Sequence, residues 1–132
     1  MLTMPAPDAG VLARRDEIVA ALRVIVPGEG IVATPAEMRA FETDGLSAYR
    51  QMPMVVALPE TTAQVAAILR YASANGIRIV PRGAGTSLSG GALPLADAIL
   101  LGLGKFNRVL DIDYDNRCVT VQPGVTNLAI TQ

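Results

Sequence analysis

The sequence predicts an α+β fold, and two patterns carry that prediction. Apolar runs at residues 54–58 and 77–80 flank a segment with helical periodicity, which is the order of a strand–helix–strand unit. Two alternating segments near the end of the chain predict a β-hairpin. Strands joined by a crossover helix run parallel, so we expect the first two strands to form a parallel pair.

The first fifty residues are predicted to form a tail followed by helices. Residues 1–9 contain two prolines and no periodicity, whereas apolar positions recur at helical spacing from about residue 11 to residue 26. Pro27-Gly28 ends that helix. We predict that residues 1–50 form an N-terminal tail and helical segment. Residues 51–132 are predicted to form a separate domain.

A short second helix is predicted from residue 34. Thr34-Pro35-Ala36-Glu37 has the sequence of a capping box, in which Thr34 accepts from the backbone N–H of Glu37. Pro35 suits the first helical position. We expect this helix to end near Asp44-Gly45.

The central unit begins with a buried strand over residues 54–58. A second capping box at residues 61–64 starts a helix, and Asn75-Gly76 provides its left-handed end. Residues 77–80 form the next strand. A further strand is predicted over residues 98–101.

The hairpin is predicted from strands over residues 108–113 and 118–122, with a polar turn between them. Thr126 or Asn127 then caps a helix. Because the chain ends in the first turn of that helix, we expect the domain to be incomplete at its C-terminal end.

Composition excludes several classes of function. The chain has 132 residues, a formal net charge of −1, no His and one Cys. Scattered charges give no basic patch for nucleic acid, and the missing His removes catalysis or metal binding through imidazole. The long uncharged stretches are broken by Gly and Pro, so no transmembrane segment is predicted. One Cys cannot form an internal disulfide, which suits the cytoplasm.

Four side chains near the hairpin invite a functional role. Cys118 is interpreted as a small buried hydrophobic residue rather than a reactive thiol. Asp111, Asp113 and Asp115 could suggest a cation, but the favoured interpretation is that they cap the turn and protect a strand edge. No metal ligand is therefore assigned.

The loop over residues 82–91 is the most informative segment. Four of its ten residues are Gly, three are Ser or Thr, and none is acidic. Glycines let backbone N–H groups approach an oxyanion, so the loop suits a phosphate or pyrophosphate. It directly follows a predicted strand, where α/β sheets place ligands. The alternative is an ordinary flexible turn.

Two common nucleotide motifs fail at specific positions in this loop. A dinucleotide G-x-G-x-x-G would place its third Gly where Leu88 stands. A P-loop would place Lys and Ser or Thr where Gly91 and Ala92 stand.

The sequence of residues 81–91, with residues 58–62 and the helix to Gly76, resembles the FAD-binding domain shared by vanillyl-alcohol oxidase and p-cresol methylhydroxylase (PCMH-type). Within that superfamily it is most similar to the FAD-linked subunits D of bacterial glycolate oxidases. Residues 44–50, 102–107 and 121–128 carry this similarity. The resemblance implies a βαβ subdomain and the start of a second α+β subdomain.

The resemblance also implies the cofactor and its ligands. Residues 82–87 would wrap the FAD pyrophosphate, residues 90–91 would lie toward the flavin, and residues 123–125 would form a second loop. The implied cofactor-binding residues are Pro81, Arg82, Gly83, Ala84, Gly85, Thr86, Ser87, Gly90, Gly91, Pro123, Gly124 and Val125. Some relatives attach FAD through a His, and this chain has none, so attachment should be noncovalent.

The implied function is the FAD-binding part of a dehydrogenase for small 2-hydroxy acids such as glycolate or D-lactate. Hydride would pass to FAD and electrons to a partner. The implied partners are a second FAD-domain subunit and an iron–sulfur subunit, at the inner face of a membrane. Two alternatives stay open: reduction of an enolpyruvyl sugar nucleotide on the same fold, and a non-catalytic nucleotide-binding module. The resemblance implies that the catalytic residues lie in later sequence, so no catalytic residue is assigned and this segment alone is expected to be inactive.

Overall fold

Four strands form one mixed sheet in the computed structural model, which describes residues 4–131. The strands are β1 (Ile31–Val32), β2 (Val55–Ala57), β3 (Arg78–Arg82) and β4 (Ala98–Gly102), in the order β1-β2-β4-β3. β1 pairs antiparallel with β2, whereas β2, β4 and β3 run parallel. The predicted α+β class is confirmed.

β2 and β3 run parallel as predicted, but they are not neighbours, because β4 lies between them. All five residues of β4 are buried. A strand that is apolar throughout is most stable in the centre of a sheet, with a strand on each side and cover on both faces. β3 instead lies at the edge and continues two residues beyond the predicted end, through Pro81 and Arg82. Proline is tolerated there because an edge strand forms a ladder on one side alone.

The helices are α1 (Ala9–Ala13), α2 (Arg15–Ile25), α3 (Pro35–Met38), α4 (Thr62–Ala74) and α5 (Asn127–Thr131). The helix predicted over 11–26 is thus two helices, divided at Arg14, whose guanidinium donates to the carbonyl of Asn75 at 3.1 Å. Residues 1–3 of the predicted tail lie outside the described residues, and so does Gln132.

The short helix after Thr34 differs from its prediction in two ways. α3 ends at Met38 and continues only as a 3-10 turn, η2 (Arg39–Phe41), so it stops before Asp44. The Thr34 hydroxyl donates to the Glu37 carboxylate instead of accepting from its N–H. At the start of α4, Thr61 does accept from the N–H of Gln64 at 3.2 Å, as predicted. At the far end of that helix Gly76 takes a left-handed φ of 65°.

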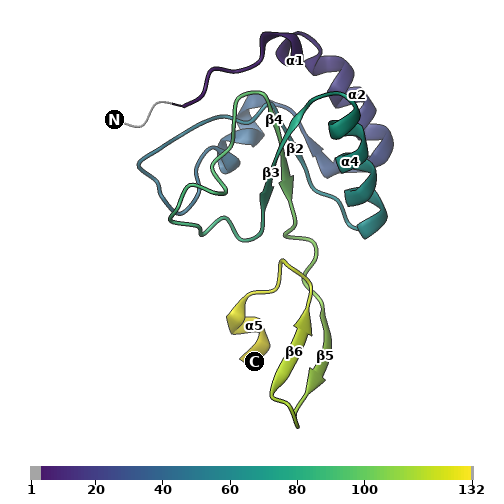
Figure 1. The fold of residues 1–132 in the computed structure, drawn as a ribbon, viewed down its shortest axis with the longest axis vertical. Helices are drawn as coiled ribbons and strands as arrows, with labels where there is room; N and C mark the ends of the chain where they lie inside the picture. Colours follow the sequence, from purple (N-terminus) through teal and green to yellow (C-terminus); the bar gives the residue numbers. More distant parts are fainter. Residues whose placement is uncertain (1–3, 132) are drawn as a thin grey trace.

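The sheet has a different cover on each face (Figure 1). Helices α2 and α4 pack on one face, whereas α3, through Met38, the turn η2, through Phe41, and loops pack on the other. Successive strand side chains point to opposite faces, so one core contains Val55 and Ile99 while the other contains Val56 and Leu100. α2 and β1, from the first fifty residues, share the first core with α4. The domain boundary at residue 51 stays a prediction.

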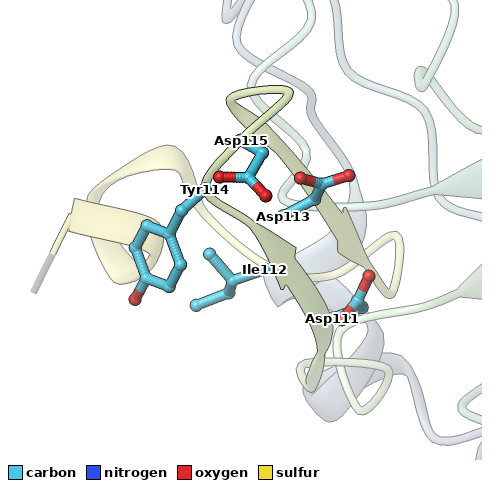
Figure 2. Close-up of a pocket in the computed structure, with 5 residues that line it drawn as sticks. All are labelled: Asp111, Ile112, Asp113, Tyr114 and Asp115. Carbon is cyan, nitrogen blue, oxygen red and sulfur yellow. The ribbon is translucent and has the colours of Figure 1, made fainter.

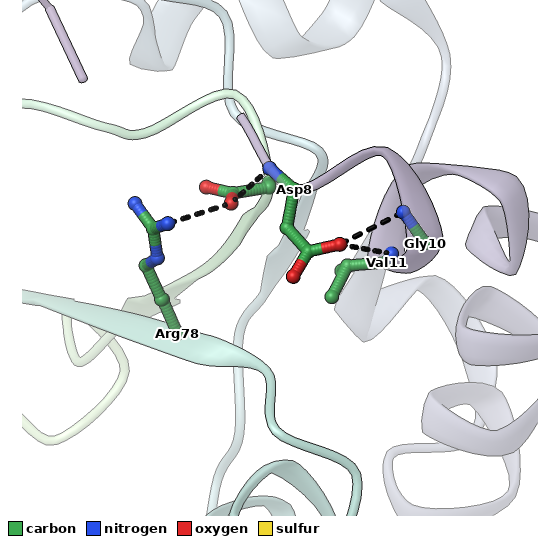
Figure 3. A network of polar contacts seen from close by, with 5 residues as sticks. Asp8, Gly10, Val11 and Arg78 are labelled. Carbon is green, nitrogen blue, oxygen red and sulfur yellow. Dashed lines mark hydrogen bonds and ion pairs between the residues drawn. The ribbon is translucent and has the colours of Figure 1, made fainter. Parts of the chain in front are cut away.

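A buried carboxylate ties the N-terminal segment to the sheet (Figure 3). Asp97, just before β4, is 2% exposed, and its Oδ2 accepts from the backbone N–H of Asp8 at 2.8 Å. The same oxygen lies 3.3 Å from Nη2 of Arg78. Asp8 in turn caps α1 by accepting from Gly10 and Val11.

The predicted hairpin is confirmed as β5 (Val109–Asp113) and β6 (Cys118–Val121), which pair antiparallel with an irregularity between Val109 and Asp111. It projects with α5 from the end of β4 (Figure 1). Thr126 caps α5 by accepting from the N–H of Ala129 at 3.3 Å. Among the described residues, no helix combines the length and apolar character that crossing a membrane requires.

Leu22→Ala should destabilise the protein by about 2–5 kcal/mol, because it leaves a cavity between α2 and the sheet. Leu22 is 0% exposed, whereas Val24 on the same helix is 84% exposed. Val24→Ala should therefore change the free energy of unfolding by less than about 0.5 kcal/mol. Urea denaturation measures both values, and equal effects would contradict the packing of α2 described above.

Candidate functional site

The carboxyl ends of three parallel strands lie side by side, and we call this side of the sheet its carboxyl edge. β2, β4 and β3 finish at Ala57, Gly102 and Arg82, and the loops that follow them lie together at this edge. Ligands of open α/β sheets bind outside the carboxyl ends of the strands. The glycine-rich loop, residues 83–91, therefore leaves the sheet where a ligand is expected.

The glycine-rich loop presents backbone donors that the protein itself does not use. The carbonyl of Arg82 still accepts from the N–H of Leu103 at 2.8 Å, which is the last contact with the sheet. Within the described chain, none of the N–H groups of residues 83–88 donates a hydrogen bond. Gly85 and Gly90 have φ values of 71° and 76°, which glycine adopts without strain.

The side chains of residues 83–91 add hydroxyl groups and carry no charge. Thr86 is exposed and Ser87 half-buried, and the Ser87 hydroxyl accepts from the N–H of Ser89 at 3.3 Å. Gly91 has open space around it, because a methyl group added there would meet no heavy atom within 4 Å. Free N–H groups, hydroxyls and the absence of acidic side chains together form an anion-binding surface.

The second predicted segment, residues 123–125, lies against the first. A methyl group added to Gly83 would lie 3.3 Å from the carbonyl oxygen of Pro123. The N–H of Gly124 donates to the carbonyl of Phe106 at 2.8 Å. A methyl group added to Gly124 would lie 2.5 Å from the carbonyl oxygen of Leu103, so only glycine fits there. The fold thus brings together two segments that are far apart in the sequence.

Arg82 differs from the rest of the loop because its side chain points inward. It is 7% exposed, and Nη2 donates to the carbonyl of Ala92 at 2.6 Å. Burial lowers the pKa of the Arg82 guanidinium, and the negative charge of Asp44 partly opposes that shift.

Asp44 and Gly45 were not among the predicted site residues, yet they contact the loop. A methyl group added to Gly45 would lie 2.7 Å from the carbonyl oxygen of Thr86. Asp44 is 6% exposed and accepts from the N–H of Leu46 at 2.9 Å. The Asp-Gly dipeptide signals a tight turn in the sequence, but nothing in the sequence indicates that this turn meets the loop.

Two hollows border the site. One, of about 420 Å³, lies beside the second half of the loop and is lined by Met4, Pro5, Leu46, Tyr49, Ser89, Gly90, Leu93 and Leu95. The other, of about 330 Å³, is largely apolar and is lined by Thr62, Val65, Leu103, Phe106, Leu110, Val121, Gln122 and Pro123.

A sequence profile described as an FAD binding domain matches residues 53–132. The chain belongs to this family. The resemblance identified from residues 81–91 is thereby confirmed, and this FAD-binding domain contains both loops described above.

Curated relatives agree with the family. The chain is 49% identical over 118 residues to the glycolate oxidase subunit GlcD of Escherichia coli (strain K12), covering 89% of this chain and 24% of that protein. It is 32% identical over 110 residues to D-2-hydroxyglutarate dehydrogenase of Xanthomonas citri pv. viticola, covering 83% and 23%. The chain thus spans about a quarter of the length of these relatives.

Solved structures share the fold. Substrate-bound p-cresol methylhydroxylase superposes with a TM-score of 0.79 at 19% identity, covering 98% of this chain and 26% of that one. The 4-ethylphenol oxidase from Gulosibacter chungangensis also gives a TM-score of 0.79, at 26% identity, covering 97% and 25%. The predicted PCMH-type fold is confirmed.

The residues of the FAD-binding domain fit the pyrophosphate of FAD. Six consecutive N–H groups have no acceptor among residues 4–131, and a diphosphate supplies acceptor oxygens of opposite charge. Added methyl groups at Gly45 or Gly124 would collide with the backbone around the two loops, so the loops can take this shape only with glycine there.

The acidic residues of the hairpin do not form a metal site. Figure 2 shows a shallow hollow lined by residues 111–115, with Ile112 and Tyr114 on the other side of the strand from Asp111 and Asp113. Asp113 accepts from Nδ2 and the N–H of Asn116 at 2.7 and 2.9 Å. The described residues contain no group of acidic or sulfur ligands that could hold a metal ion. The interpretation of Asp113 as a turn cap is confirmed.

The interpretation of Cys118 as a buried residue is wrong. Cys118 is exposed, and its Sγ donates to the carbonyl of Asn116 at 3.3 Å. It begins β6, and every residue of β5 and β6 is exposed or half-buried. The alternation of the hairpin therefore does not mark a buried face.

Asn116→Ala should raise the titration midpoint of Asp113. The side chain and the N–H of Asn116 hold the pKa of the Asp113 carboxyl below its usual value, because both donate to the charged form. The stabilisation of the turn is therefore complete above the pKa of the unfolded chain and is lost as the pH falls through the lower, folded pKa. Carboxyl ¹³C NMR titration measures the midpoint, and an unchanged value in the variant would contradict this cause.

Proposed function

We propose that this FAD-binding domain serves a flavin-dependent dehydrogenase of small 2-hydroxy acids. The observation that carries the proposal is the glycine-rich loop at the carboxyl edge of the sheet, whose N–H groups at residues 83–88 donate no hydrogen bond among the described residues. The 49% identity to a glycolate oxidase subunit indicates the substrate class.

The named relatives support one substrate chemistry. Glycolate, D-lactate and D-2-hydroxyglutarate appear in the names of three matching proteins, and all three are 2-hydroxy carboxylates. Bound FAD supplies the hydride acceptor for oxidation of such an alcohol. Glycolate or D-lactate are the substrates we propose.

FAD is held by two groups of residues in this proposal. The N–H groups of residues 83–88, with the hydroxyls of Thr86 and Ser87, bind the pyrophosphate. Gly90 and Gly91 leave room toward the flavin, and Pro123, Gly124 and Val125 close the other side. Pro81 and Arg82 set the end of the strand from which the loop departs.

Attachment of FAD to this chain is proposed to be noncovalent. The chain contains no His, so it offers no imidazole for a covalent flavin link. We assign no catalytic residue to the chain, which spans about a quarter of the curated relatives. The proposed partners are a second FAD-domain subunit and an iron–sulfur subunit at the inner face of a membrane, where electrons leave the flavin.

The intact protein should carry FAD that is bleached by glycolate or D-lactate. Absorbance of the purified flavoprotein under anaerobic conditions measures this, because reduced flavin loses its visible bands. Ethylene glycol, an alcohol without the carboxylate, serves as the substrate control and should leave the bands unchanged. Purification without flavin in the denatured supernatant would overturn the proposal.

The two alternative functions give different results in the same experiment. Bleaching by NADPH without response to hydroxy acids would indicate reduction of a substrate such as an enolpyruvyl sugar nucleotide. Equal affinity for ADP and FAD, with no bleaching by either donor, would indicate a nucleotide-binding module.

Gly85→Ala should raise the Kd for FAD by about tenfold. The left-handed φ of 71° costs alanine roughly 1–2 kcal/mol, and the new methyl would lie 3.3 Å from Cδ of Arg82. Flavin fluorescence quenching on the intact apoprotein measures the Kd.

Gly76→Ala is the matched control, because Gly76 has a similar φ of 65° and open space around it at the opposite end of β3. It should lower the Tm and leave the Kd for FAD unchanged. Equal loss of affinity in both variants would mean that strain anywhere in the fold weakens binding, which would contradict a specific role for the loop.

A further inference from the structure

The buried polar groups beneath the glycine-rich loop are not explained by packing alone. Nε of Arg82 and Oδ2 of Asp44 are both buried, and neither has a hydrogen-bond partner in the described part of the chain. Buried polar atoms are normally partnered, so an unpartnered pair of opposite charge is unusual. Within residues 4–131 no ion pair joins the two side chains, although the negative charge of Asp44 opposes the lowering of the Arg82 pKa by burial.

Arg82 spans the base of the loop from within. Its carbonyl accepts from the N–H of Leu103, directly after β4, and its guanidinium donates to the carbonyl of Ala92, where the loop ends. The stem of the side chain lies directly under Gly85, because a methyl group there would meet Cδ of Arg82 at 3.3 Å. One side chain therefore joins the beginning, the middle and the end of the loop.

The turn at Asp44-Gly45 supports the loop from a second direction. Oδ1 of Asp44 accepts from the N–H of Leu46, which holds the turn closed. Gly45 lies so near the loop that a methyl group would be 2.7 Å from the carbonyl oxygen of Thr86 and 2.9 Å from that of Ser87. The carbonyl oxygens of Thr86 and Ser87 therefore lie on the side of the loop that faces the turn. The matching family profile begins at residue 53, after this turn.

We propose that Asp44, Gly45 and Arg82 are positioning residues that hold the glycine-rich loop in its anion-binding shape, an inference that rests on the FAD-binding function proposed above. Arg82 acts from beneath the loop and does not contact the phosphates. Its charge adds to the positive potential of the N–H groups above it, while Asp44 keeps that charge in place. The cofactor site thus extends into the first fifty residues.

The test uses Asp44→Asn and Gly45→Ala in the intact protein. Asp44→Asn keeps the shape of the side chain and removes its charge, and Gly45→Ala pushes the turn away from the loop. Each should raise the Kd for FAD on the order of tenfold, because a loop that is not preorganised binds more weakly. Riboflavin, which lacks phosphate, should bind each variant as it binds the wild type.

Two control variants separate positioning from general stability. Asp97→Asn changes another buried carboxylate, which lies at the opposite end of β4, and should lower the Tm without changing the Kd for FAD. Gly104→Ala adds a methyl group that meets no heavy atom within 4 Å and should change neither value.

Hydrogen–deuterium exchange of the apoprotein supplies a readout that does not depend on FAD. The readout is the N–H groups of Leu93 and Leu103, which donate to the carbonyls of Gly90 and Arg82 at 3.2 and 2.8 Å. In both test variants these two N–H groups should exchange faster than in the wild type, whereas those of α4 should not. Faster exchange in α4 as well would indicate global destabilisation and would overturn the positioning role.

The outcomes distinguish the two proposals. Wild-type affinity for FAD in both test variants, with unchanged exchange at Leu93 and Leu103, would overturn the positioning role and leave the FAD function standing. Faster exchange at Leu93 and Leu103 in a protein whose wild type binds no FAD would support the positioning role and overturn the FAD function. If Asp44→Asn fails to fold, Gly45→Ala alone decides between these outcomes.

Discussion

The burial of β4 is the constraint on which the rest of the structure depends. Its five residues are apolar or glycine and all are buried, so it needs a strand on each side and cover on each face. β2 and β3 pair on its two sides. Helices α2 and α4 cover one face of the sheet, and α3, η2 and loops cover the other. Because the three strands are parallel, all of their carboxyl ends lie at one edge, and the loops that follow must share that space.

Crowding at that edge explains the distribution of glycine in the site. Gly45 and Gly124 each lie near the carbonyl oxygens of another loop, where a side chain would collide, and a methyl group on Gly83 would contact that of Pro123 tightly. The N–H groups of residues 83–88 meanwhile have no partners among the described residues. Such donors are costly in a folded protein unless water or a ligand binds them, and an anion binds them best. The packing of the sheet and the chemistry of the cofactor loop therefore have the same origin.

Membership of the FAD-binding family places this arrangement in a wider context. The similarity to p-cresol methylhydroxylase extends over 98% of the chain at only 19% identity, so the shape persists while most side chains differ. The phosphate site proposed above consists mainly of backbone N–H groups, which the chain offers whatever its side chains are. Side chains matter where they shape the backbone, as Arg82 does beneath its own loop.

Local patterns determined most of the secondary structure and the position of the cofactor loop. Capping at Thr61, the left-handed Gly76, the hairpin turn at Asp113 and the glycine-rich sequence after β3 all depend on residues close together in the chain, so the sequence alone predicts them. Only the tertiary structure decided that β4 separates β2 from β3, that Cys118 is exposed, and that Asp44-Gly45 meets Thr86. The strand order and the contact at Asp44-Gly45 depend on segments that are distant in the chain. The exposure of Cys118 depends on the absence of a cover for the hairpin among the described residues. No local pattern of apolar and polar residues specifies any of the three.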